Sequence, residues 1–392
     1  MPDLTGLDAD RLVEQAREAT GLSDLGEDTW REGLDRLLWS LRKEAALSDL
    51  GVLVVQTEMV SYLTRRLGIV DEHRRVPSNA ATDVPPPIVI IGQARTGTTI
   101  LFDLLGQDPE HRVPLSWEVD LPTPPPEPEN YETDPRIEQA QAFVDASETL
   151  IPGFLAMHPI GARLGQECVR ITGGDFRSLI FCTQYRIPSY GRWVLHEADM
   201  APAYRYHRLY LQHLQSRHRK PRWVLKSPAH LWSLGALLHE YPDALLVQTH
   251  RDPLKIIASV SSLQAKLRTL ASSDVQLPEI ANEWADYILL GLERGIDARE
   301  DKTVRPDRVV DVQFRDFMAD PFATIHAIYE RLGLSLSTEA ERHMRDYLAA
   351  NPSDKHGAHS YSFADTGLDA GELRARAKRY QEYFEVPDES LG

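Results

Sequence analysis

A loop bounded by two glycines, GQARTGTT, follows the apolar run IVII at residues 88–91. Gly92 and Gly97 have the separation of the glycines in the nucleotide-phosphate loop G-x-x-x-x-G-K-[ST]. A loop of this kind, between a buried strand and a helix, directs backbone N–H groups and the positive helix end at a phosphate. Thr98 stands at the position of the lysine, and Arg95 supplies a cation inside the loop. The loop therefore suits one phosphate and its ester bridge better than a triphosphate.

Two other interpretations of this loop are weaker. A dinucleotide-binding loop, G-x-G-x-x-G, requires a second glycine that the pair Gln93-Ala94 does not provide. A strand–turn–helix connection with glycines for geometry alone would leave an arginine and two helix-start threonines, Thr98 and Thr99, without a purpose.

Cationic side chains also follow two later apolar runs. Arg251 comes directly after ALLVQTH, and Ser259 lies about two turns into a helix that begins near Pro253. Both side chains are placed to meet one anion at the edge of a sheet. The HRD triplet does not indicate a protein kinase, because Ile257 occupies the position of the metal-binding asparagine. Lys226 ends the run RWVLK, at the strand end where open α/β sheets bind ligands.

Together, the three segments resemble the sulfotransferases that use 3′-phosphoadenosine-5′-phosphosulfate (PAPS), most closely a bacterial branch with a long helical N-terminus. The resemblance extends over most of residues 20–380 and includes LKSPAH and DKHGAHSYS. It implies that GQARTGTT is the 5′-phosphosulfate loop and RDPLKIIAS the 3′-phosphate motif. Many members have a lysine where this chain has Arg95, whereas tyrosylprotein sulfotransferases share the arginine. PAPS has a single 5′-phosphate joined to sulfate, so it requires neither a triphosphate lysine nor a metal ion.

The resemblance also implies which residues bind PAPS. The loop backbone and two threonines hold the 5′-phosphate, and Arg251 and Ser259 hold the 3′-phosphate. In the family, a loop with the sequence R-K-G near the C-terminus closes over the 3′-phosphate. Lys355, His356 and Gly357 stand at that position in this chain. The expected PAPS-binding residues are Gln93, Ala94, Arg95, Thr96, Gly97, Thr98, Thr99, Arg251, Ser259, Lys355, His356 and Gly357.

Sulfuryl transfer, like phosphoryl transfer, is an in-line displacement in which negative charge collects on the leaving phosphate. Arg95 and Lys226 are the catalytic cations expected to meet that charge. A general base must take the proton of the acceptor. Glu118, in PLSWEVD, is the first candidate, because the tyrosylprotein enzymes carry their catalytic glutamate near this position. Glu167 and His158 are the alternatives, and Glu118 would then be a surface carboxylate or a structural partner of Arg95.

Composition limits the location and the partners of the protein. The formal net charge is −16 and no block of basic residues is present, which argues against nucleic acid as a partner. Cys168 and Cys182 are too few for a disulfide framework. The first residues do not resemble a signal peptide, and no apolar run approaches the roughly 20 residues that cross a bilayer. We therefore expect a cytoplasmic protein.

A particular set of elements must position these segments. Short apolar runs alternate with helical segments, which predicts an α/β fold with a P-loop-type parallel sheet flanked by helices on both faces. We expect an all-helical N-terminal cap at residues 1–82, a sulfotransferase domain at 83–392, and within it a helical substrate-side insertion at 131–220. The expected strands are 88–91, 222–226, 244–250 and 308–312, and the expected helices are 98–107, 229–240, 253–270 and 320–333.

The expected activity is transfer of a sulfuryl group from PAPS to a hydroxyl of a small-molecule or lipid-like acceptor, with 3′,5′-adenosine bisphosphate as the product. This expectation for the acceptor, small or lipid-like, rests on the aromatic and apolar content of residues 136–220 and on the helical N-terminal cap. The alternatives are a nucleotide kinase or another P-loop nucleotide enzyme, and a non-catalytic nucleotide-binding scaffold. A second copy of the chain is a further expected partner.

Overall fold

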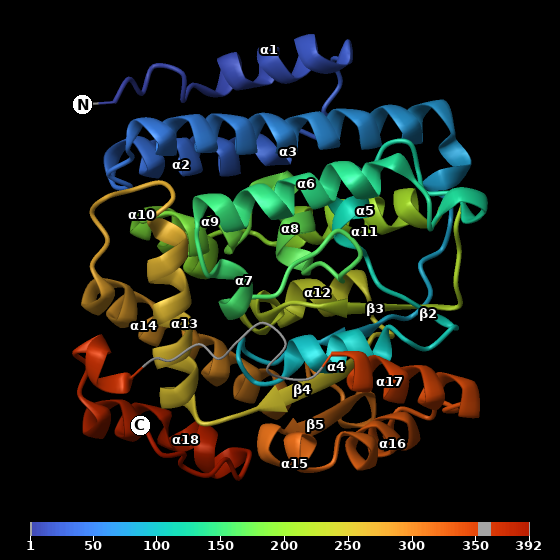
Figure 1. Ribbon diagram of the computed structural model, residues 1–392, viewed down its shortest axis with the longest axis vertical. Helices are drawn as coiled ribbons and strands as arrows, with labels where there is room; N and C mark the ends of the chain where they lie inside the picture. Colours follow the sequence, from blue (N-terminus) through green and yellow to red (C-terminus); the bar gives the residue numbers. More distant parts are fainter. Residues whose placement is uncertain (1, 352–361, 392) are drawn as a thin grey trace.

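Five parallel strands form one sheet in the order β2-β3-β1-β4-β5, in a computed structural model that describes residues 2–351 and 362–391 (Figure 1). Four of the strands match the predicted ones. β2 has no predicted counterpart, because its two residues are too few to give an alternating pattern. The strands are β1 (Ile88–Ile90), β2 (His111–Arg112), β3 (Arg222–Lys226), β4 (Leu245–His250) and β5 (Val309–Gln313).

The central strand β1 sends successive side chains to opposite faces of the sheet, and helices cover both faces. Ile88 and Ile90 pack into a core with α4, α16 and α17. Val89 packs on the other face with α11 and α12. The predicted P-loop-type α/β fold with helices on both faces is therefore confirmed. The helices concerned are α4 (Thr98–Leu105), α11 (Ala201–Gln215), α12 (Leu234–Glu240), α16 (Pro321–Arg331) and α17 (Thr338–Ala350).

Three N-terminal helices lie at the top of Figure 1, away from the sheet. Leu34 and Leu63 belong to the same buried cluster as Phe181 and Ile257, so these helices share one core with later segments. A separate folding unit at residues 1–82 stays a prediction, since the core continues across that boundary. The three helices are α1 (Ala9–Thr20), α2 (Thr29–Lys43) and α3 (Asp49–Arg75).

The segment between β2 and β3 is mainly helical. Its helices are α5 (Ser116–Asp120), α6 (Pro135–Leu150), α7 (Phe154–Met157), α8 (Cys168–Thr172), α9 (Ile180–Gln184), α10 (Pro188–His196) and α11. The remaining helices relevant to the site are α13 (Pro253–Arg268), α14 (Leu277–Glu300), α15 (Phe314–Ala319) and α18 (Ala370–Tyr383). The helix expected at 229–240 is divided into a 3-10 turn, Pro228–Trp232, and α12. Among the described residues, no helix combines the length and the apolar composition that a membrane crossing requires.

Candidate active site

The glycine loop between β1 and α4 is held in one shape by its neighbours. A Cβ at Gly92 would lie 1.7 Å from Oγ1 of Thr249 in β4, so this position requires glycine. The Thr96 hydroxyl donates to the carbonyl of Gln93 at 2.6 Å and lies 2.5 Å from the Thr249 hydroxyl. Arg95 and Gly97 have positive φ angles of 69° and 86°, which turn the chain sharply before α4. Thr96 is therefore a buried support of the loop.

The rest of the loop faces a large cavity. The cavity has a volume of about 930 Å³, at the upper end of the range for small-molecule sites. The Nε2 atom of Gln93 is buried and has no hydrogen-bond partner among the residues that the structure describes. Gln93 precedes the N-cap of α4, so this atom is an unused donor of the loop itself and not of the helix start. The loop residues that line the cavity are Gln93, Ala94, Arg95, Gly97, Thr98 and Thr99.

The second cationic motif is joined directly to this loop. Arg251 Nη1 donates to the carbonyl of Arg95 at 2.9 Å, and Arg95 Nε donates to the Ser259 hydroxyl at 3.0 Å. Arg251 lines the cavity, whereas Ser259 is buried behind it. The remaining donors of Arg251 form an ion pair with Glu389, from the segment after α18. The two predicted phosphate motifs thus meet at one end of the cavity.

Lys226 and Glu167 form an ion pair beside the loop. Lys226 Nζ lies 2.6 Å from Glu167 Oε1, and the lysine side chain is 2% exposed. Glu167 immediately precedes α8 and lines the cavity, as does His158 after α7. Burial lowers the pKa of His158 to about 4, the positive charges of Lys226 and Arg95 act in the same direction, and the negative charge of Glu167 opposes them. His158 is therefore a neutral imidazole near pH 7.

Glu118 lies elsewhere, fully buried and outside the lining of the cavity. One of its carboxylate oxygens pairs with Arg112 of β2. The other accepts from the Leu115 N–H at 3.0 Å and from the Tyr131 hydroxyl at 3.0 Å. The contact with Leu115 is a helix-start bond of α5. The structure thus gives Glu118 structural partners, which differ from the expected Arg95, and brings the alternative candidates Glu167 and His158 to the cavity.

Three of the expected ligands, Lys355, His356 and Gly357, lie outside the described residues. Within the described ranges, no group of three or more His, Cys, Asp or Glu side chains is arranged to hold a metal ion.

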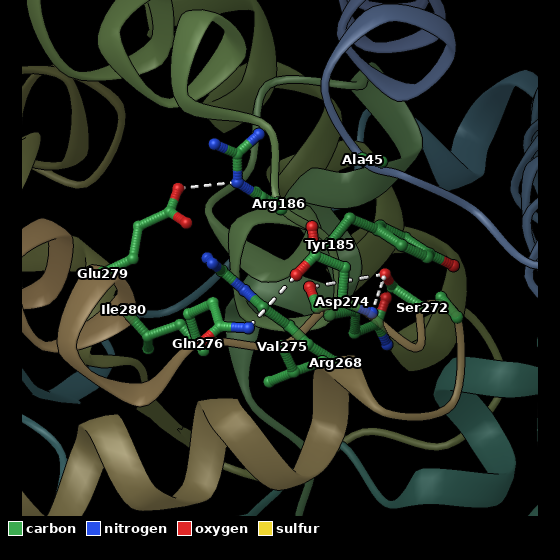
Figure 2. Close-up of a pocket in the computed structure, with 12 residues that line it drawn as sticks. Ala45, Tyr185, Arg186, Arg268, Ser272, Asp274, Val275, Gln276, Glu279 and Ile280 are labelled. Atoms are coloured by element: carbon green, nitrogen blue, oxygen red, sulfur yellow. Dashed lines mark hydrogen bonds and ion pairs between the residues drawn. The ribbon is translucent and has the colours of Figure 1, made fainter.

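A second pocket, of about 10 Å³, is lined by Tyr185, Arg186 and Glu279 among others (Figure 2). Arg186 and Glu279 face each other across it, with Arg186 Nε 2.6 Å from Glu279 Oε1. The glycine loop, Arg251 and Glu167 line the large cavity, and none of them lines this pocket. The large cavity is therefore the candidate active site.

Known proteins are similar to this chain over most of its length. The model of the sulfotransferase family matches residues 86–338. The omega-hydroxy-beta-dihydromenaquinone-9 sulfotransferase Stf3 of Mycobacterium bovis is 26% identical over 288 residues, which cover 70% of this chain and 69% of Stf3.

Two crystal structures resemble the whole fold. The sulfotransferase STF1 of Mycobacterium tuberculosis H37Rv has a TM-score of 0.84 and 33% identity, with 94% of this chain and 98% of STF1 covered. The sulfotransferase STF9 of Mycobacterium avium has a TM-score of 0.88 and 30% identity, with 98% of each chain covered. The family match covers well over half of the chain, and the two crystal structures match nearly all of it, so the chain belongs to the sulfotransferase family.

Proposed function

We propose that the protein transfers a sulfuryl group from PAPS to a hydroxyl of a lipid-like acceptor. The observation that carries this proposal is the meeting of the lysine-free glycine loop, Arg251 and Glu167 on one cavity. The loop suits a single phosphate group, and Arg251 offers a second anion site near it. PAPS has one phosphate on the 5′ position and one on the 3′ position of its ribose. Two separate phosphates match this pair of sites better than a triphosphate does.

PAPS supplies the sulfuryl group, and the chain supplies its binding and orientation. We assign the 5′-phosphate to the loop backbone with Thr98 and Thr99, since these groups begin α4 and face the cavity. The 3′-phosphate is assigned to Arg251, whose fork geometry suits a phosphate. Ser259 contributes through its bond to Arg95.

The catalytic groups follow from the ion pair beside the loop. We assign Glu167, and no longer Glu118, as the general base, because its carboxylate lines the cavity while both oxygens of Glu118 are engaged in the protein interior. In the reaction the bond from sulfur to the acceptor oxygen forms as the bond to the phosphate oxygen breaks. The acceptor proton passes to Glu167, and the charge left on the phosphate is stabilised by Lys226 and Arg95.

The acceptor class rests on the other walls of the cavity. Away from the loop these walls are formed mainly by apolar side chains of α3, α6 and α13, which a long hydrocarbon would cover. The relative Stf3 acts on a menaquinone derivative with an omega-hydroxyl group. The apolar residues concerned are Leu50, Leu53 and Val54 of α3, Phe143, Val144 and Leu150 of α6, Leu263 and Leu267 of α13, and Leu270, which follows α13.

Two measurements test this function. Isothermal titration with 3′,5′-adenosine bisphosphate, 5′-AMP and ATP plus magnesium should give the tightest binding for the bisphosphate. Preference for ATP would support a nucleotide kinase instead. Labelled sulfate should then move from PAPS to long-chain alcohols, and no transfer to any hydroxyl compound would support a scaffold. The cytoplasmic location and the homodimer stay predictions from the sequence.

A further inference from the structure

The segment after α18 places a carboxylate on the arginine assigned to the 3′-phosphate. Arg251 Nε donates to Glu389 Oε1 at 2.9 Å, and Nη2 donates to Oε2 at 2.9 Å. Two parallel bonds of this kind are the geometry by which arginine binds carboxylates and phosphates alike. Glu389 therefore occupies the edge of Arg251 that a phosphate would need.

Glu389 is held in this position by a network around the start of α13. Its N–H donates to Asp252 Oδ2 at 2.7 Å. Arg374 of α18 binds both oxygens of Asp252, at 2.6 and 2.7 Å, and also lies 2.9 Å from Asp388. The backbone of the segment thus has an anchor that does not depend on Arg251. The Glu389 side chain can leave Arg251 while its backbone stays attached.

Arg251 itself is fixed independently of Glu389. Its Nη1 donates to the Arg95 carbonyl in the loop at 2.9 Å, and its guanidinium lies 4.1 Å from the ring centre of Phe314. Arg251 lines the cavity, and its side chain is 17% exposed while that of Glu389 is 33% exposed, so the ion pair is partly accessible to solvent. A phosphate dianion carries more charge than a carboxylate and would compete well for the same two donors.

We propose that Glu389 is an internal competitor of the 3′-phosphate, which the donor displaces on binding and which returns as the bisphosphate product leaves. This inference rests on the proposed function, because it requires a ligand with a 3′-phosphate at Arg251. The side chain lowers the affinity for PAPS and for 3′,5′-adenosine bisphosphate alike. Its return to Arg251 accelerates release of the product, which retains the 3′-phosphate. A ligand without that group, such as 5′-AMP, leaves the ion pair intact.

The test compares two ligands on four proteins, the wild type, Glu389→Gln, Glu389→Ala and Glu382→Gln, by isothermal titration with the full chain. Glu389→Gln should tighten binding of 3′,5′-adenosine bisphosphate about tenfold, because a neutral amide competes less well for Arg251. Binding of 5′-AMP should change less than twofold. Glu382→Gln removes the same charge from an exposed position on α18, where Glu382 contacts Lys378, and should alter neither affinity. Stopped-flow dissociation of the bisphosphate from Glu389→Gln should be slower by a similar factor.

The outcomes separate this inference from the proposed function. Wild-type protein that binds the bisphosphate no better than 5′-AMP would contradict the proposed function. A clear preference for the bisphosphate, unchanged in Glu389→Gln and in Glu389→Ala, would overturn the competitor role alone. Equal tightening of both ligands would overturn it as well, since that result indicates a general charge effect. Melting temperatures measured without ligand establish that each variant is folded.

Discussion

Lys226 and Glu167 bring opposite charges together at the carboxyl edge of the sheet, with Nζ and Oε1 2.6 Å apart. The lysine side chain is 2% exposed and that of Glu167 is 20% exposed, so the carboxylate lies on the cavity side of the pair. A buried lysine without a counter-charge would destabilise the folded protein. Glu167 provides the counter-charge when PAPS is not bound. The same pair can serve the reaction, since one member accepts a proton and the other faces the developing charge.

Glu167→Gln should lower turnover about a hundredfold or more, the usual scale for loss of a general base. The amide retains the size of the side chain and can still contact Lys226, but it cannot accept the acceptor proton. Binding of 3′,5′-adenosine bisphosphate should be unchanged or tighter, because the negative charge beside Lys226 is removed. Steady-state turnover with an alcohol acceptor and titration with the bisphosphate measure the two effects. Wild-type turnover in this variant would transfer the role to His158.

Glu118→Gln should lower the free energy of unfolding. The change leaves the buried guanidinium of Arg112 without its counter-charge, and loss of one member of a buried pair costs about 3 kcal/mol or more. Urea unfolding should show this loss in the free energy of unfolding. Turnover per folded molecule should stay within about threefold of wild type, a small fraction of the effect of losing a base. A hundredfold loss of turnover at unchanged stability would restore Glu118 as the base.

The sequence allowed the phosphate loop, the four longer strands and the cationic motifs to be predicted, because each is encoded within about ten neighbouring residues. The choice between Glu118 and Glu167 could not be made in this way. Both are single glutamates near the start of a helix, and what distinguishes them is the contact of Glu167 with Lys226, which lies 59 positions further along the chain.

Glu389 carried no local signal at all. It is separated from Arg251 by 138 positions along the chain. An acidic residue near a C-terminus is ordinarily a solvated side chain, and nothing in VPDESLG marks it as a partner of an arginine. The relationship arises from the packing of α18 against α13 and α14, which no pattern within the segment encodes.

Arg251→Ala should weaken binding of 3′,5′-adenosine bisphosphate by about 2 to 3 kcal/mol, because a charge-assisted contact to a dianion is lost. Binding of 5′-AMP should change much less. In the Arg251→Ala background, Glu389→Gln should no longer tighten binding of the bisphosphate, because Glu389 competes with the 3′-phosphate only through Arg251. Titration of the two single variants and the double variant measures this coupling. Additive effects would show that Glu389 acts through some other group.

Stability should decrease as the pH falls from 7.5 to 5.5. Burial lowers the pKa of His207 and of His230 to about 3, from an ordinary value near 6.5. Between these values the unfolded chain binds protons that the folded protein excludes, so acidification favours unfolding. Each histidine should contribute a loss of about 1.4 kcal/mol over this interval. Urea unfolding at the two pH values measures the loss, and His207→Gln should reduce it. A free energy of unfolding that is constant between them would contradict the folded-state pKa values.

Leu53→Glu should impair transfer to long-chain acceptors while sparing short ones. Leu53 lines the cavity from α3 and is 59% exposed, so the change should not disturb folding. A charge there would have to be desolvated by any hydrocarbon that extends along the wall. The KM for a sixteen-carbon primary alcohol should rise about tenfold, equivalent to about 1.4 kcal/mol, whereas that for butanol stays the same.

The matched control is Trp39→Glu, which places the same charge at an apolar position that is 48% exposed and outside the cavity lining. It should alter neither KM, and neither variant should change the affinity for 3′,5′-adenosine bisphosphate, which binds at the loop. Equal effects of Leu53→Glu on both alcohols would indicate that the acceptor chain does not follow α3. A loss with both variants would indicate that general surface charge, rather than the apolar wall of the cavity, controls access of the acceptor.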